Sequence, residues 1–329
     1  MIINFPRMQI HTNMDVISKK ICLRRSYTDV LKIISAFCVV IGHYASFTLI
    51  NNWSDSPILH IIASQAGYIG VALFFFLSGY GLMESEQKEH LDFLHFAKRR
   101  FLKIYKPVVL ITIIWVVFEL LFLQKELSWD LIYTVLWGFD DCVLWFVKIL
   151  MGLYLLFYVF SFYKNKDKSH IGYGVLVIGS VILMIIAKRT DGFSPIGIPC
   201  FMLGVIASVT KDIKIETVLL GSLFFVSAAY SAITHDNQGY HAAFDYGLIW
   251  ILLMVPLIMR SKFSQEYKGA SKWLAYTSAL TFDIYLIHYK VLDGMTIMGG
   301  GKKIYLIVYL AVVLVISFLY NKLRTIIKV

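Results

Sequence analysis

The stretch Thr28–Phe47, TDVLKIISAFCVVIGHYASF, decides the class of fold. Its length suits a helix that crosses a bilayer, which needs about 20 mostly apolar residues, yet it contains Lys32 and His43. An ionisable side chain near the bilayer centre costs about 3 kcal/mol even on insertion scales, so such residues are rare and usually functional. The stretch therefore predicts a membrane helix whose two ionisable side chains face the interior of a protein bundle.

The spacing of these residues predicts one polar stripe. His43 lies eleven positions after Lys32, and at about 100° and 1.5 Å per residue both lie on one helix face, roughly 16 Å apart. Asp29, one turn earlier, falls near the same stripe. Two structural interpretations stay open: Lys32 could extend to the membrane surface as an anchor, and His43 could simply bond to a neighbouring helix.

Composition extends this interpretation to the whole chain. Of its 329 residues, 58% are hydrophobic and 16% charged, and the mean hydropathy is +0.70. The apolar runs are continuous, unlike the short alternating segments of a membrane barrel. We predict an all-α, polytopic helical bundle of about ten transmembrane helices, at residues 29–49, 66–83, 104–123, 143–162, 171–187, 194–209, 216–233, 242–259, 273–291 and 303–321.

The basic residues predict the orientation. The net charge is +10, but most Lys and Arg residues lie in alternate connections, as the positive-inside rule requires with both termini cytoplasmic. This placement argues against nucleic acid as a partner. We expect a basic N-tail at 1–28 without a cleavable signal peptide, one transmembrane domain at 29–321 and a short C-tail at 322–329. The apolar stretch 129–138 is too short to span and is interpreted as re-entrant.

Two further segments carry unusual residues. The stretch Tyr68–Ser85, YIGVALFFFLSGYGLMES, combines aromatic residues with Ser78, Gly79 and Tyr80. Small residues let membrane helices pack closely, which explains the glycines and is the structural alternative for Ser78.

The stretch Phe96–Pro107, FAKRRFLKIYKP, places five basic residues at the start of the third predicted helix. Positive-inside topology needs fewer charges than this. Arg offers forked donors and Lys a point charge, so the segment suits a polyphosphate. Contact with anionic lipid headgroups is the alternative.

At these three segments the sequence resembles the membrane acyltransferase 3 family, bacterial enzymes that O-acylate surface carbohydrates. Lys32 and His43 match the family's Arg or Lys, ten residues, His pattern; GVALFFFLSGYGL (Gly70–Leu82) and RRFLKIYKP (Arg99–Pro107) are similar to its second-helix and third-helix motifs. Weaker similarities follow at 144–154, 198–208 and 282–292. Lysine replaces the more usual arginine at 32 and 103, which keeps the charge but loses bidentate geometry.

The resemblance implies an acyl-coenzyme A donor, with acetyl-CoA favoured, and a hydroxyl of a cell-surface, capsular or lipid-linked sugar as acceptor. It also implies a multi-pass protein of the bacterial inner membrane. Arg99, Arg100 and Lys103 would bind the donor phosphates, helped by the partial charge of the third helix's N-terminus. Lys32 and His43 are the catalytic candidates, with His43 either a general base or a transient acyl carrier.

We assign His288, Ser78 and Tyr80 to substrate binding, although an interfacial histidine bonded to water is an equal alternative for His288. No metal is expected, because no histidine or carboxylate pair has ligand spacing on one face. Two other functions stay open: a transporter or flippase, and a non-enzymatic scaffold of polysaccharide assembly.

Overall fold

The protein is described from a computed structural model. The structure describes residues 25–124, 145–166, 168–189, 197–210, 212–258, 268–299 and 303–327, together with 23, 126, 128, 129, 133 and 195. All regular elements in this part of the chain are helices: α1 (Arg25–Ile50), α2 (Pro57–Glu86), α3 (Phe93–Phe122), α5 (Trp145–Asn165), α6 (Ser169–Arg189), α7 (Ile198–Thr210), α8 (Ile213–Thr234), α9 (Gln238–Ile258), α10 (Lys268–Met298) and α11 (Leu306–Ile326).

Each of the ten predicted segments corresponds to one of these helices, so the prediction of a polytopic helical membrane protein is confirmed. Seven of them, α1, α2, α3, α5, α6, α8 and α11, are long and apolar enough to cross a membrane. Helix α7 is apolar but has only 13 residues. The proposed re-entrant stretch 129–138 lies almost wholly outside the described residues, as does most of the predicted N-tail 1–28, whose last four residues belong to α1.

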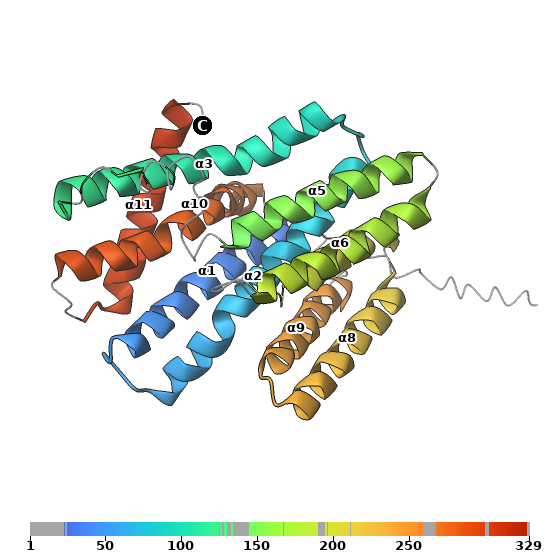
Figure 1. Ribbon diagram of the computed structural model, residues 1–329, viewed down its shortest axis with the longest axis horizontal. Helices are drawn as coiled ribbons and strands as arrows, with labels where there is room; N and C mark the ends of the chain where they lie inside the picture. The colour runs from blue at the N-terminus through green and yellow to red at the C-terminus, as the bar shows by residue number, and fades with distance from the viewer. Residues whose placement is uncertain are drawn as a thin grey trace, which may run out of the picture.

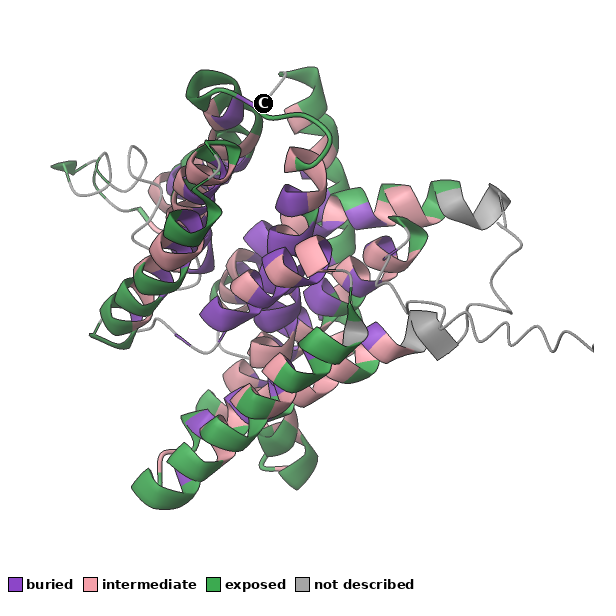
Figure 2. Ribbon diagram, turned by 90° about the vertical axis from the view of Figure 1, so that its right-hand side faces the viewer, coloured by how far each residue is buried: buried purple, intermediate pink, exposed green. Residues whose placement is uncertain are grey.

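Helices α1 and α2 form the centre of the bundle. They pack against each other, with α10 against α1 and α7 against α2, while α5 pairs with α6 and α8 pairs with α9 (Figure 1). The buried residues gather where these helices meet, and the outward faces are exposed (Figure 2). Exposed apolar faces of this kind suit contact with lipid rather than water. On α1, the polar residues Asp29, Ser35 and Thr48 are buried in the interior.

A pair of glycines brings α2 and α7 into backbone contact. A Cβ atom at Gly79 would overlap the backbone oxygen of Phe201, and one at Gly204 would overlap the backbone oxygen of Phe76. Only glycine permits this approach, which is how small residues stabilise helix pairs in membranes. The contact fixes the part of α2 that carries Ser78 and Tyr80.

Helix α3 begins earlier than predicted, at Phe93 rather than near 104. The side chain of Asp92 accepts a hydrogen bond from the backbone N–H of His95 at 3.2 Å, which is a helix N-cap. Arg99, Arg100 and Lys103 therefore lie in the second and third turns. The prediction that the partial charge at the helix N-terminus helps to bind the donor phosphates is therefore wrong, because that charge acts only within the first turn.

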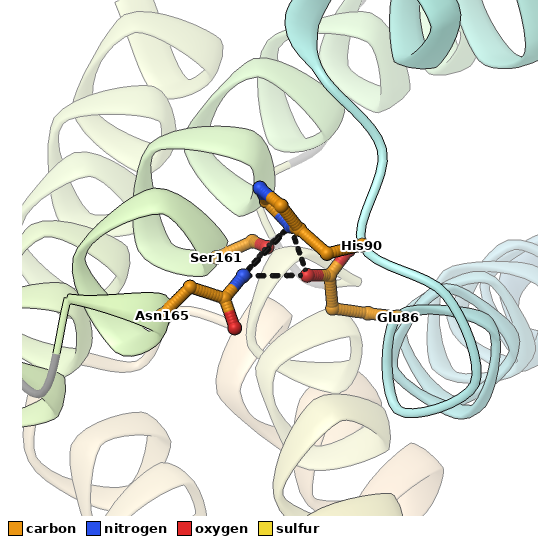
Figure 3. Close-up of polar contacts among 4 residues, drawn as sticks. All are labelled: Glu86, His90, Ser161 and Asn165. Carbon is orange, nitrogen blue, oxygen red and sulfur yellow. Dashed lines mark hydrogen bonds and ion pairs between the residues drawn. The ribbon is translucent and has the colours of Figure 1, made fainter.

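A polar cluster ties the connection between α2 and α3 to α5 (Figure 3). Asn165 donates from Nδ2 to Oε1 of Glu86 at 2.9 Å, and Nδ1 of His90 lies 2.5 Å from the same Glu86 oxygen. The hydroxyl of Ser161 lies 3.3 Å from Nδ1 of His90. Because Glu86 ends α2 while Ser161 and Asn165 end α5, the cluster fixes the path of the chain into the basic part of α3.

Candidate active site

A cavity of about 720 Å³ collects most of the residues that the sequence singled out. It lies among α1, α2, α3, α5, α10 and α11. Six of the eight predicted site residues line it: Lys32, Ser78, Tyr80, Arg99, Arg100 and Lys103. These residues belong to three helices and to three separate sequence motifs. The packing of the helices brings them together around one cavity.

The α3 part of the cavity wall is basic and suits an anion. Within the described part of the chain, the buried Nε atom of Arg100 has no hydrogen-bond partner. Arg99 forms an exposed ion pair with Glu89 at 3.1 Å, and Lys103 is exposed. A buried guanidinium N–H without a partner is costly, so Arg100 in particular is ready to donate to a phosphate.

Lys32 faces the cavity beside a buried carboxylate. The Oδ1 atom of Asp29, a residue only 5% exposed, accepts hydrogen bonds from Nζ of Lys32 at 3.3 Å and from the hydroxyl of Ser278 at 2.7 Å. Ser278 belongs to α10, so the start of the predicted stripe on α1 faces α10 and the cavity. The stripe points into the bundle, as its spacing predicts.

The other end of the stripe meets a second histidine. The Nδ1 atom of His43 lies 2.7 Å from the Nε2 atom of His288 on α10, and the rings stack with centroids 4.9 Å apart. His288 is fully buried, whereas His43 is partly exposed. The structure thus brings a predicted catalytic residue and a predicted substrate-binding residue into direct contact.

The hydrogen bonds around this pair define its tautomers. The Nδ1 atom of His288 lies 2.6 Å from the backbone oxygen of Tyr285. A carbonyl oxygen only accepts, so Nδ1 of His288 carries the proton and Nε2 of the neutral ring is an acceptor. His43 must then donate from its own Nδ1. This arrangement places the basic lone pair of His43 on Nε2.

Tyr285 connects the histidine pair to the cavity. It lines the cavity, its backbone oxygen holds His288, and its ring centroid lies 5.7 Å from that of His288. His43 and His288 themselves are not part of the cavity wall. The pair therefore lies just behind the wall formed by Tyr285.

The cavity also contains cations that the sequence did not single out: Arg25, Lys88 and Arg324. In the sequence these residues count only as positive charges beside membrane segments, so nothing local marks them. The C-tail predicted from the sequence, 322–329, includes Arg324, but α11 continues past the predicted end at 321 to Ile326.

The protein is thus a polytopic helical membrane protein with a cavity lined by basic residues and an adjoining histidine pair. The family model described as an acyltransferase domain, acyltransferase 3, matches residues 25–322. The chain belongs to this family and is a membrane acyltransferase. The family match therefore supports neither the transporter nor the scaffold alternative. No curated protein and no solved structure matched the chain.

Proposed function

We propose that the protein is an O-acyltransferase of the bacterial inner membrane. It moves an acyl group, most simply acetyl, from cytoplasmic acyl-CoA to a hydroxyl of a surface, capsular or lipid-linked sugar. One observation carries the proposal: six residues chosen from separate motifs line one cavity, and Tyr285 joins that cavity to the histidine pair.

The donor binds in the cavity. Arg99, Arg100 and Lys103 hold the phosphates of CoA, because forked and point cations together suit a polyphosphate. The pantetheine arm extends past Lys32 and Ser78 toward Tyr285. By the positive-inside rule the basic part of the cavity faces the cytoplasm, where acyl-CoA is made.

His43 acts on the acceptor hydroxyl. Its Nε2 lone pair takes the hydroxyl proton while the hydroxyl oxygen attacks the thioester carbonyl carbon. The C–S bond then breaks, and the CoA thiolate takes the proton back from the imidazolium. His288 accepts the Nδ1–H of His43 throughout, so it holds the reactive tautomer and stabilises the transient charge, as the third group of a catalytic triad does.

A covalent route uses the same geometry. In that route Nε2 of His43 attacks the thioester, thiolate leaves, and the acyl-imidazole passes its acyl group to the sugar hydroxyl. The hydrogen bond from Nδ1 to His288 serves both routes equally. Rapid quenching of the enzyme with radiolabelled acyl-CoA and no acceptor distinguishes them, because only the covalent route labels the protein.

The function is tested in the native host. The gene is deleted and then restored as wild type or as His43→Ala at equal membrane levels, and proton NMR of the purified surface glycan records its O-acyl signals. Loss on deletion, with rescue by wild type only, supports the proposal. Unchanged O-acylation in the deletion strain rules out that glycan as the acceptor, and full rescue by His43→Ala removes His43 from the chemistry.

A further inference from the structure

Arg324 on α11 is held at the cavity by a buried carboxylate from α10. Its Nη1 atom lies 3.1 Å from Oδ1 of Asp283, whose side chain is fully buried, while the Arg324 side chain is 20% exposed. The second oxygen, Oδ2, accepts a hydrogen bond from Nδ2 of Asn321 at 2.6 Å. Asp283 therefore contacts two α11 side chains, through a hydrogen bond from Asn321 and through an ion pair with Arg324 that lacks hydrogen-bond geometry.

The ion pair with Asp283 uses only part of the hydrogen-bonding capacity of the Arg324 guanidinium. A guanidinium has five N–H donors in a fixed fork, and an ion pair through Nη1 leaves others for a second anion. Arg324 lines the same cavity as Arg99, Arg100 and Lys103, but from a different helix. An anion inside the cavity would thus meet cations from both α3 and α11.

We propose that Arg324 is a donor-binding residue that contacts a phosphate of acyl-CoA, and that Asp283 and Asn321 are positioning residues that aim it. The inference rests on the proposed function. It assigns a role to the end of α11, which no sequence motif indicated. It also explains why a fully buried Asp283 pairs with a mostly buried Arg324, an arrangement that by itself adds little to stability because both charges must be desolvated.

A purely structural role would be to join α10 to α11, and paired variants separate the two roles. Arg324→Gln removes the cation but leaves Asp283 buried without its partner, which destabilises the fold. The double variant Asp283→Asn with Arg324→Gln removes both charges. Lys322→Gln is the matched control, since Lys322 is exposed on the same helix and is not part of the cavity wall.

The experiment titrates CoA into the detergent-purified full chain by calorimetry and records thermal unfolding of each variant. We expect Kd for CoA to rise about tenfold in Arg324→Gln, equivalent to about 1.4 kcal/mol. The double variant should recover its unfolding temperature but stay weak for CoA, and Lys322→Gln should match wild type. Wild-type affinity for CoA in the double variant would overturn the inference, even if Arg324→Gln alone fails to fold.

Three further outcomes are distinguished. Direct titration of short-chain phosphatidylglycerol tests a lipid headgroup as the phosphate source; a Kd for the lipid that rises in the double variant while its Kd for CoA stays at the wild-type value would assign Arg324 to lipid and overturn the proposal. If wild type transfers acyl groups while the double variant binds CoA normally, the inference fails and the proposed function stands. If wild type neither binds CoA nor transfers acyl groups, both fail.

Discussion

The Nδ1 atom of His43 lies 2.7 Å from the Nε2 atom of His288, although 245 residues separate the two histidines in the chain. Because Nδ1 of His288 donates to the backbone oxygen of Tyr285, the proton between the rings belongs to His43. The second histidine thus fixes which nitrogen of the first is basic. The backbone carbonyl of Tyr285 on α10 thus determines which nitrogen of His43 on α1 is basic.

Removing His288 should slow catalysis without weakening donor binding. In His288→Ala, His43 loses the acceptor that holds its tautomer, and we expect kcat to fall roughly 100-fold, the lower range for general acid–base catalysis. KM for acyl-CoA should stay at the wild-type value, because the phosphate site proposed on α3 and α11 does not include His288. Steady-state kinetics in proteoliposomes measures both constants. A rise in KM with unchanged kcat would instead place His288 in substrate binding, as the sequence predicts.

Removing Arg100 should weaken donor binding without slowing catalysis. Its buried Nε atom has no partner among the described residues, so we expect Arg100→Gln to raise KM for acyl-CoA by about tenfold, as loss of one charge-assisted hydrogen bond does. Lys106→Gln is the control, because Lys106 is exposed on the same helix and does not line the cavity. Equal KM values in the two variants would contradict a donor site on α3.

Charge at position 32 should matter more than residue identity. Among the described residues, Lys32→Met leaves the buried Asp29 with the Ser278 hydrogen bond alone, and we expect acyl transfer to fall at least about tenfold, in line with an unpaired buried charge. Lys32→Arg keeps the charge and restores the residue more usual in the family, so activity should stay within about threefold of wild type. Full activity of Lys32→Met would return Lys32 to the role of a membrane anchor.

The contact between α2 and α7 should tolerate no added methyl group. Gly79→Ala forces Cβ against the backbone oxygen of Phe201, and overpacking of this kind costs about 1–3 kcal/mol. Gly221→Ala on α8 is the control, since open space surrounds that position. Thermal unfolding in detergent should show a lower transition for Gly79→Ala only. Equal transitions would mean that the two helices can separate without cost.

The sequence predicted the helices well because bilayer thickness forces long apolar runs. It placed helix ends less well: α3 continues into its basic segment and α11 to Ile326, since an N-cap or a polar turn extends a helix without any apolar signal. Six of the predicted site residues, from motifs near each other in the chain, line one cavity. The contact of His43 with His288 and the pairing of Arg324 with Asp283 were not, because each depends on which helices pack side by side.

One measurement tests the central claim, that His43 performs acyl transfer from CoA, most directly. Purified wild type, His43→Ala and Lys106→Gln are reconstituted, and release of free CoA thiol from acetyl-CoA is followed with surface glycan from the native host as acceptor. We predict glycan-dependent thiol release by wild type and Lys106→Gln, and a loss of roughly 100-fold or more in His43→Ala. Wild-type rates in a folded His43→Ala protein would contradict it.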